Sequence, residues 1–236
     1  MKRLGIISST VLGKSKTFEN LEERTVENEF GKATVLISDT AAYIPRHGKN
    51  TKHHILPHLI NHKANLKALK DLGVEEVVGT NSTGSLKRHL KPGMLVVPDD
   101  FIMFSGGPTI FNTKPVHITP VLSEEVRQKL IEAAHDCNMD VINGGVYWQT
   151  TGPRLETRAE ISMMAQFADL VGMTMGDEAV IAGELDLHYA SICSVDNYAH
   201  GLEEKELTME KILWHARRNA GSIVKIVVRY MERREG

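Results

Sequence analysis

The chain has 236 residues, of which 42% are hydrophobic and 25% are charged, as is typical of a globular protein with one sizeable core. The 28 basic and 30 acidic residues leave a net charge of -2, which argues against electrostatic capture of nucleic acid or of an acidic membrane. Two cysteines, Cys137 and Cys193, are too few for a disulfide framework, and no apolar stretch is long enough to span a bilayer. The chain opens in a strand-like run without a secretory signal, so we expect a cytoplasmic protein whose residues 1–236 form one domain.

Short apolar runs alternate with helical patterns along the chain. A hydroxyl and two carboxylates at Ser123, Glu124 and Glu125 mark one helix start, because they satisfy the free N–H groups of a first turn. The alternation predicts an α/β fold, with a central mixed, mostly parallel sheet flanked by helices on both faces. We predict strands over 4–7, 33–37, 77–79, 94–97, 145–149, 170–173 and 189–195, and helices over 63–70, 123–136, 158–167, 178–185 and 209–231.

The residues that follow the predicted strands are the candidate site, because open α/β sheets bind ligands beyond the carboxyl ends of their strands. Hydroxyls combined with an Arg suit phosphate, since the guanidinium fork can meet two phosphate oxygens. Each segment alone is equally consistent with a turn, a helix cap or a surface pair. The chain has neither a Walker loop nor a G-x-G-x-x-G after its first strand. The segments are Ser8-Ser9-Thr10, Arg46-His47-Gly48, Thr80-Asn81-Ser82-Thr83-Gly84-Ser85, 150–156, Met173-Thr174 and Asp196-Asn197-Tyr198.

Glu156 and Asn197 together match the edge of a neutral 6-oxopurine. Its N1–H is a donor and its O6 and N7 are acceptors, whereas a carboxylate only accepts and an amide both donates and accepts. A 6-aminopurine reverses this polarity and would leave groups unpaired, at about 1–3 kcal/mol each. Taken alone, Glu156 is also consistent with a surface salt bridge to Arg154 or Arg158.

A series of motifs then occurs in a fixed order along nearly the whole chain. This series resembles the trimeric branch of purine nucleoside phosphorylases and methylthioadenosine/methylthioinosine phosphorylases, and is most similar to the methylthioinosine enzymes. The motifs are Leu4-Gly5-Ile6-Ile7, Arg46-His47-Gly48, His53-His54-Ile55-Leu56-Pro57-His58, Asn61, Ala64-Asn65, Gly84-Ser85-Leu86, Lys91-Pro92-Gly93, Gly152-Pro153-Arg154-Leu155-Glu156-Thr157-Arg158-Ala159-Glu160-Ile161, Val171-Gly172-Met173-Thr174 and Glu178-Ala179.

The resemblance implies a pentosyltransferase of purine salvage that needs no cofactor and uses inorganic phosphate as co-substrate. It implies a homotrimer or homohexamer, in which His117 reaches a neighbouring subunit's site near the 5' end of the sugar. Asn197, Glu156, Arg46 and His47 are the implied catalytic residues. The implied phosphate ligands are Thr10, Arg46, His47, Ser82 and Thr174, Met173 packs against the ribose, and the other candidate substrate contacts are Ser9, Asn81, Leu155, Asp196 and Ala199.

The same resemblance narrows the substrate. Adenine-type relatives carry Ser in place of Glu156 and two aspartates in place of Asn197 and Ala199, whereas 6-oxopurine enzymes carry Glu and Asn at the first two positions. Enzymes for inosine and guanosine carry His where this chain has Met209, and an apolar Met suits a methylthio group. The combination favours 5'-methylthioinosine, although Met209 is equally consistent with a core position in the last helix. A methylthioadenosine phosphorylase and a broad inosine/guanosine phosphorylase remain alternatives.

The chain departs from the family pattern at four places. The usual Gly-Gly-Thr of the first turn is Ser8-Ser9-Thr10, and two extra residues separate Arg46 from His53. Asp177 replaces a Pro before Glu178, and Leu155 replaces an aromatic.

The residues alone are also consistent with three other interpretations: a metal site, a nucleosidase and a nucleoside sensor. The spacing of His54, His58 and His62 suggests a metal site, but Pro57 disfavours a regular helix there and zinc needs a further ligand, so we expect no metal. A nucleosidase would use water instead of phosphate and would not need the Arg46-His47 pair. A nucleoside sensor would bind without turnover, and fold alone does not exclude it.

Overall fold

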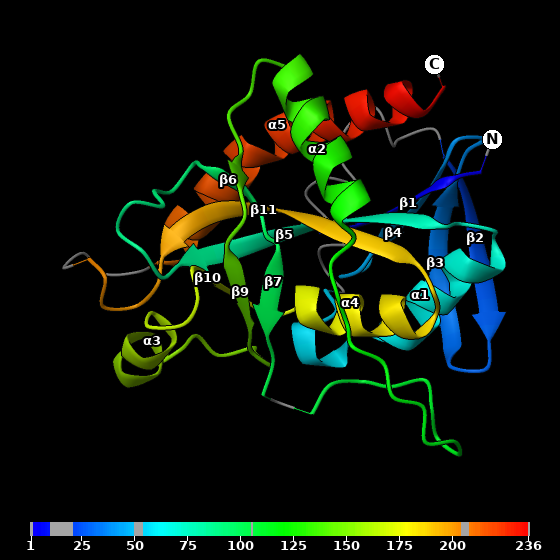
Figure 1. The fold of residues 1–236 in the computed structure, drawn as a ribbon, viewed down its shortest axis with the longest axis horizontal. Coiled ribbons are helices and arrows are strands. Elements are labelled where there is room, and N and C mark those ends of the chain that lie inside the picture. Colours follow the sequence, from blue (N-terminus) through cyan, green and yellow to red (C-terminus); the bar gives the residue numbers. More distant parts are fainter. Residues whose placement is uncertain (1, 10–20, 50–53, 105, 204–207, 236) are drawn as a thin grey trace.

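The protein is described here from a computed structural model that covers residues 2–9, 21–49, 54–104, 106–203 and 208–235 (Figure 1). Strands and helices alternate along the chain, and the predicted α/β class is confirmed. The strands are β1 (Leu4–Ser8), β2 (Glu22–Asn28), β3 (Gly31–Ile37), β4 (Ala41–Pro45), β5 (Glu76–Ser85), β6 (Leu95–Val97), β7 (Asp100–Ile102), β8 (Ile142–Asn143), β9 (Val146–Gln149), β10 (Leu170–Gly172) and β11 (His188–Tyr198). The helices are η4 (Pro57–Leu59), α1 (His62–Asp71), α2 (Glu124–Asp136), α3 (Arg158–Met164), α4 (Met175–Glu184) and α5 (Met209–Glu235).

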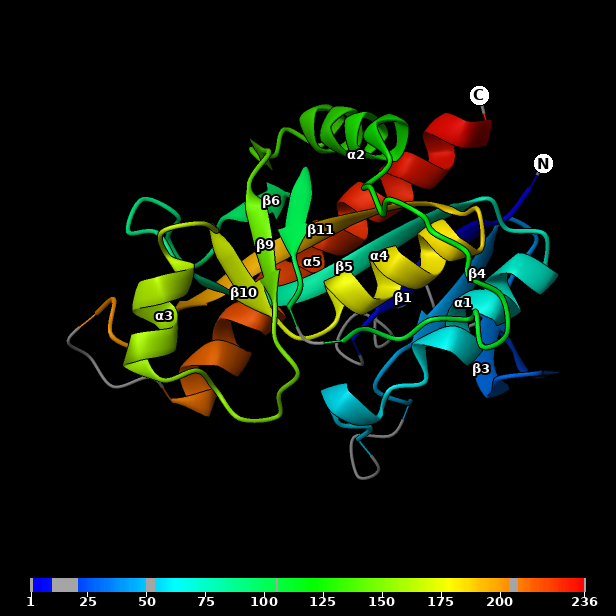
Figure 2. The same ribbon diagram turned by 60° about the horizontal axis from the view of Figure 1, so that its bottom comes forward.

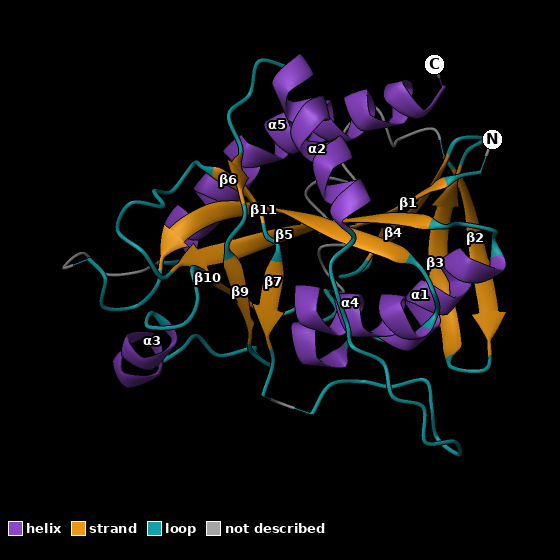
Figure 3. Ribbon diagram, viewed as in Figure 1, coloured by secondary structure: helices purple, strands orange, loops and turns teal. Residues whose placement is uncertain are grey.

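The strands join into one mixed sheet in the order β2-β3-β4-β1-β5-β10-β9-β7, with β11 also paired to β5. The central pairs β1–β4, β1–β5 and β11–β5 are parallel, while β2–β3, β3–β4, β10–β5 and β11–β6 are antiparallel. Figure 3 shows this sheet as a central layer between helices. The parallel centre places the carboxyl ends of β1, β4, β5 and β11 at one edge, where the site lies.

Helices cover both faces of the sheet, with α1 and α4 on one side and α2 and α5 on the other (Figure 1). Alternate side chains of β1 explain this, because Ile6 packs in the core under α2 and α5 whereas Ile7 packs under α1 and α4. A smaller core joins α3 to β9 and β10 through residues such as Trp148 and Ile161. Because side chains alternate between the two faces along each strand, one strand contributes to the cores on both faces of the sheet.

Local capping explains where several helices begin. Ser123 accepts a hydrogen bond from the N–H of Val126, which confirms the predicted start of α2. Thr157 and Glu160 form a reciprocal capping box at the start of α3, and Asn61 accepts from the N–H of Ala64 at the start of α1.

Several element bounds differ from those predicted. The segments 80–85 and 196–198, expected as loops, continue β5 and β11, because both strands remain hydrogen-bonded to each other as far as Tyr198. Helix α4 begins three residues earlier than predicted and α3 ends three residues earlier. Strands β2, β4, β7 and β8 were not predicted: β2 is an exposed polar edge strand, β4 begins with two alanines and ends at a proline, and β7 and β8 have only three and two residues.

Figure 2 shows the long connection between β7 and α2 passing along α4. Glu184 at the end of α4 holds it, because its carboxylate accepts hydrogen bonds from the Thr109 hydroxyl at 2.7 Å and the Ile110 N–H at 2.7 Å. Among the described residues, we find no helix that combines the length and apolarity needed to cross a membrane.

Candidate functional site

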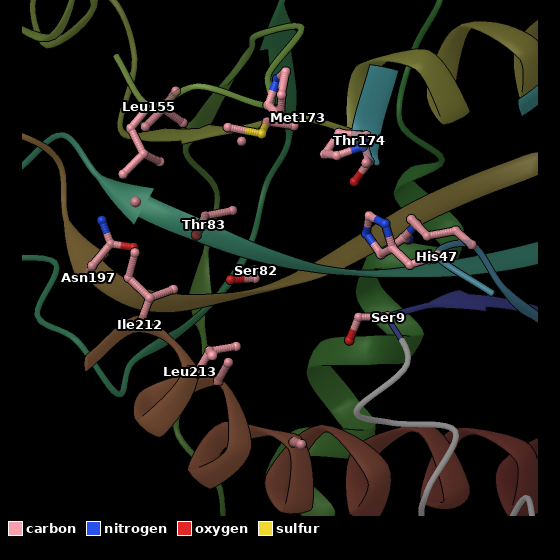
Figure 4. A pocket seen from close by; sticks show the side chains of 18 of the residues that line it. Ser9, His47, Ser82, Thr83, Leu155, Met173, Thr174, Asn197, Ile212 and Leu213 are labelled. Atoms are coloured by element: carbon pink, nitrogen blue, oxygen red, sulfur yellow. The ribbon is translucent and has the colours of Figure 1, made fainter. Parts of the chain in front are cut away.

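A cavity of about 1200 Å³ opens at the carboxyl ends of the strands. Its described lining includes the residues that follow β1, β4 and β10 together with the last residues of β5 and β11, so the structure brings the predicted strand ends together. Helix α5 forms a further wall. Figure 4 shows Ser9, His47 and Thr174 toward one end, Asn197 and Leu155 toward the other, and Ser82 and Thr83 between them.

Glu156 lines the cavity and directly follows Leu155, which lies at the same end as Asn197 (Figure 4). It is 9% exposed, and its carboxylate accepts one hydrogen bond from the Thr150 hydroxyl at 2.9 Å. Thr150 is held in turn by its backbone N–H, which donates to the Gly172 carbonyl at 2.8 Å. The remaining carboxylate lone pairs are therefore available to a ligand donor. Arg154 pairs with Glu160 instead, so the surface salt bridge considered for Glu156 is not formed with Arg154.

Asn197 reaches the cavity because of a β-bulge. The register of β11 against β5 shifts between Val195 and Asn197, so that Asp196 is the extra residue and Asn197 pairs with Gly84. A Cβ on Gly84 would lie 3.2 Å from the Asn197 amide nitrogen, so glycine leaves room for this side chain. The amide donates one hydrogen bond to the Tyr198 carbonyl at 2.9 Å, which leaves a second N–H and the oxygen for a ligand.

Helix α5 gives the cavity an apolar wall near Asn197. Ile212 and Leu213 project from its first turns toward the space below Asn197 (Figure 4), and Ala216, Ala220 and Val224 continue the wall along the helix. The helix is anchored there by Asn219, whose amide donates to Asp196 at 2.9 Å. Such a wall favours an apolar group on the ligand.

The opposite end of the cavity is lined by hydroxyl groups. Ser9, Ser82 and Thr174 line it, and the Asn81 amide donates to the Thr174 hydroxyl oxygen at 2.7 Å. Because that oxygen accepts from Asn81, the Thr174 proton is free to point into the cavity. Asn81 is itself held by the Ser191 hydroxyl at 2.6 Å. Asn81 is buried behind Thr174 and is not among the lining residues, so the structure makes it a support for Thr174 and not a direct contact.

Arg46 lines the cavity but already has four internal hydrogen bonds. Its Nε and Nη2 donate to the two carboxylate oxygens of Glu178 at 2.6 and 3.1 Å. Nη1 donates to the Thr80 carbonyl at 2.7 Å and Nη2 also donates to the Ile7 carbonyl at 2.9 Å. Of its five N–H groups one remains, and its charge is matched by Glu178. The sequence pattern did not indicate this pair, because Glu178 was matched only as part of a motif.

His47 follows Arg46 and faces the same end of the cavity (Figure 4). Its Nδ1 lies 2.7 Å from the Ile55 carbonyl oxygen, and its ring stacks on His54 with centroids 4.5 Å apart. Burial, the Arg46 charge and the nearby His54 lower the pKa of His47 to about 4, so the ring is neutral at pH 7. A neutral ring that donates from Nδ1 presents Nε2 as an acceptor.

The remaining predicted site residues divide into three groups. Met173 and Ala199 line the cavity. Asp196 does not, in contrast to its predicted position: it is fully buried and accepts from Ser194 at 3.0 Å and from Asn219 at 2.9 Å. His117 is exposed on the connection before α2, away from the cavity. Thr10 lies outside the described residues, and so does the side chain of Met209 at the start of α5.

Burial raises the pKa of Asp196 to about 6, so at pH 7 it is still mostly ionised and can accept from its donors Ser194 and Asn219. Burial likewise raises the pKa of the Cys193 thiol to about 12, so this thiol is not a nucleophile. Sequence reasoning missed Ile212, Leu213 and His200 as lining residues. The apolar spacing at the start of the last helix was the available signal for the first two.

The three histidines considered for a metal do not form a site. His54 stacks on His47, His58 lies in η4 and His62 lies in α1. Within the described ranges, no group of three or more His, Cys, Asp or Glu side chains is arranged to hold a metal ion.

Fold and cavity together define an α/β protein with an elongated ligand site at its strand ends. The family model of the phosphorylase superfamily matches residues 4–232. The chain is 44% identical over 229 residues to a probable 6-oxopurine nucleoside phosphorylase of Archaeoglobus fulgidus, covering 95% of this chain and 93% of that one. It is 39% identical to a probable S-methyl-5'-thioinosine phosphorylase of Methanocaldococcus jannaschii, covering 95% and 90%. The methylthioadenosine phosphorylase of Schistosoma mansoni in complex with adenine has a similar structure, with a TM-score of 0.87, 29% identity and coverage of 98% and 91%.

The chain belongs to the phosphorylase superfamily, and the family resemblance noted in the sequence is confirmed.

Proposed function

We propose that the protein catalyses phosphorolysis of a 6-oxopurine nucleoside, with 5'-methylthioinosine as its substrate and hypoxanthine and 5-methylthioribose 1-phosphate as products. One observation carries this proposal: Glu156 and Asn197 line the same cavity as the hydroxyl cluster around Thr174 and the apolar wall of α5. A base, a sugar with an apolar 5' group and an anion each find a chemically matched surface there. The names of the two archaeal relatives support the 6-oxopurine.

The base end favours a 6-oxopurine over a 6-aminopurine. The buried Glu156 carboxylate can only accept, so it matches N1–H, and the second N–H of Asn197 matches O6 or N7. An adenine would place its unprotonated N1 against the carboxylate. Such a mismatch leaves both groups without a partner, at about 1–3 kcal/mol each.

The apolar wall of α5 favours a 5'-methylthio group over a 5'-hydroxyl on the sugar. Ile212 and Leu213 offer no hydrogen bond, so a hydroxyl would lose its water without a replacement, whereas a methylthio group gains apolar contact. This wall supports the substrate independently of Met209.

The reaction proceeds through a ribosyl cation in this proposal. The purine begins to leave first, and Asn197 stabilises the negative charge that develops on N7 and O6. Phosphate accepts from Ser9, Ser82, Thr174 and the remaining Arg46 N–H, and its P–OH donates to Nε2 of His47. It stabilises the positive sugar and then bonds to the anomeric carbon. Met173 packs against the ribose. No metal or organic cofactor takes part in this scheme.

We include in the proposal a cytoplasmic homo-oligomer, a trimer or a hexamer. Large apolar side chains are exposed near the connection that carries His117, including Phe104 at 81% and Val121 at 68%. A second subunit that covers them would bring His117 close to a neighbouring site. Both cysteines are free, as is usual in a reducing compartment.

An assay panel tests the proposal. Inosine, guanosine, 5'-methylthioinosine and 5'-methylthioadenosine are each incubated with and without phosphate, and free base is measured. We expect phosphate-dependent release that is fastest with 5'-methylthioinosine. Release without phosphate would identify a nucleosidase, and tight binding without release a sensor. Preference for 5'-methylthioadenosine would assign the adenine-type activity.

A further inference from the structure

A buried histidine lies behind the anion end of the cavity without a hydrogen-bond partner. His62, the first residue of α1, is 5% exposed, and neither ring nitrogen is hydrogen-bonded within the described part of the chain. Buried polar groups are nearly always paired, so an imidazole with two unpaired nitrogens requires a reason.

The ring bridges two carboxylates of α4. Nε2 lies 3.7 Å from Oδ2 of Asp177, and Nδ1 lies 3.9 Å from Oε1 of Glu178. A neutral imidazole has one donor, whereas an imidazolium has two. When Asp177 and Glu178 are both ionised, each nitrogen faces an acceptor, and only the protonated ring can then satisfy both sides, after a shift of less than an ångström.

The anion end carries little net positive charge in this structure. The Arg46 charge is matched by Glu178, with side-chain exposures of 2% and 0%, and His47 is neutral. Arg217 and Lys225 of α5 also line the cavity, but a phosphate dianion placed beside Arg46 would still lie close to the Glu178 carboxylate. Burying such a charge is costly unless a positive charge appears nearby.

The groups that face His62 come from two elements. Arg46 and His47 follow β4, and Asp177 and Glu178 lie on α4, where Glu178 also accepts from the Tyr189 hydroxyl at 2.8 Å. Burial, and to a smaller extent the Arg46 charge, lower the pKa of His62 to about 3. The charged side chains of β2 and β3, which also pack against α1, lie in exposed pairs: Glu22 with Arg24, Glu23 with Lys49, and Glu27 with Lys32.

We propose that binding of a phosphate dianion is coupled to uptake of one proton by His62, which then pairs with Asp177 and Glu178 and makes the Arg46 charge available to the phosphate. The proton comes from solvent and returns to it when the anion leaves. His62 is thus a positioning residue that acts through Glu178 and Arg46. The inference rests on the proposed function, because it requires that the cavity bind phosphate.

Proton uptake by His62 predicts how the affinity for an anion changes with pH. If binding takes up one proton, affinity for a dianion falls about tenfold for each pH unit of increase, between the pKa values of His62 in the empty and occupied sites. Without the coupling, affinity for an anion that does not itself titrate is independent of His62.

The test is calorimetric titration with sulfate, a dianion that does not titrate in this range, at about pH 8, where Asp177 is largely ionised, in buffers of different ionisation enthalpy. We expect close to one proton taken up per sulfate in the unmodified protein and almost none in His62→Asn. His58→Asn, an exposed histidine of η4, is the matched control and should behave as the unmodified protein. Equal uptake in His62→Asn and the unmodified protein would overturn the inference, and so would uptake lost in Asp177→Asn but kept in His62→Asn.

A second measurement uses the unmodified protein, so it does not depend on whether a variant folds. The NMR shifts of the His62 ring in the unmodified protein, with saturating inorganic phosphate, should be those of an imidazolium, and those of a neutral ring without phosphate. A ring that stays neutral while the assay panel shows phosphorolysis would refute this inference and leave the proposed function standing. Absence of both phosphorolysis and anion binding would instead refute the proposed function.

Discussion

At the scale of single residues, one extra residue in β11 decides what the cavity presents to a base. Asp196 is the extra residue of the bulge and pairs with Asn219 of α5, so Asn197 and not Asp196 lies opposite Gly84 and lines the cavity. The neighbouring Gly84 leaves the space that the amide occupies.

Replacing Asn197 should therefore affect the chemical step more than binding. Asn197→Ala removes the donor to the departing purine, and loss of such a donor costs about 2.7–4 kcal/mol of barrier. We expect kcat for the preferred nucleoside to fall about 10²–10³-fold while the phosphate KM changes little. Single-turnover rates with saturating phosphate measure this, and an unchanged kcat would contradict the assigned role.

Base selectivity should follow the residues at the same end. The triple change Glu156→Ser, Asn197→Asp and Ala199→Asp reverses the donors and acceptors that face the purine, so the preference should move toward 6-aminopurines. The readout is the ratio of kcat/KM for 5'-methylthioadenosine to that for 5'-methylthioinosine. Thr150→Val, which removes the hydroxyl that donates to Glu156 and to the Gly172 carbonyl, is the control that should retain the 6-oxopurine preference. A ratio unaffected by the triple change would reject the base-reading argument.

At the scale of elements, the site is held by one ion pair that joins the end of β4 to α4. Arg46 and Glu178 are both buried, and Tyr189 of β11 also donates to Glu178. Breaking such a pair leaves an uncompensated buried charge, whereas exchanging both partners for apolar residues does not.

Glu178→Gln should consequently lower the free energy of unfolding by about 3–5 kcal/mol. The double change Arg46→Met with Glu178→Leu should cost less than this single change. Urea denaturation at pH 7 measures both. Glu22→Gln, which removes an exposed partner of Arg24, is the control and should leave stability unchanged within error. If Glu178→Gln changed the free energy of unfolding as little as Glu22→Gln does, the buried Arg46 charge would be compensated by another group.

The elements also show what a sequence can reveal about this protein. Strong periodicity and caps located α1, α2 and α5 and the core strands, because burial of one face leaves a regular apolar pattern. The continuation of β5 and β11 past residues 79 and 195 was not visible, since Asn81, Ser82, Asp196 and Asn197 are polar residues typical of loops. Their hydrogen bonds come from strand pairing, a long-range property.

The same distinction applies to the site. Motifs identified Glu156, Asn197, Arg46 and Thr174 as candidates, and all four line the cavity. The burial of Arg46 against Glu178 and the position of Asp196 behind the cavity depend on how distant strands meet. Composition and spacing along the chain carry no record of such contacts.

At the scale of the whole molecule, pH should change stability through one acid on α4. Burial and the Glu178 charge raise the pKa of Asp177 from 3.8 to about 7. The folded state thus favours the neutral carboxyl of Asp177. The stability that this preference contributes is fully present below pH 3.8 and is lost as the pH rises to about 7.

Asp177→Asn cannot ionise, so its stability relative to the unmodified protein should increase as the pH rises from about 4 to about 7. We expect a relative gain of roughly 1–2 kcal/mol over this range, because each pKa unit corresponds to about 1.4 kcal/mol and water reaches part of this carboxyl. Denaturation of both proteins at several pH values measures the difference. A difference that is constant with pH would show that Asp177 has an ordinary pKa.

The central claim is that one cavity holds a 6-oxopurine edge against Glu156 and Asn197 while an anion lies beside Thr174 and His47. A crystal structure of the protein with hypoxanthine and phosphate tests it most directly. We predict that N1 of hypoxanthine lies within hydrogen-bond distance of the Glu156 carboxylate, that O6 or N7 lies within the same distance of the Asn197 amide, and that phosphate contacts the Thr174 hydroxyl. A base bound away from Glu156 and Asn197, or phosphate bound outside this cavity, would contradict the account.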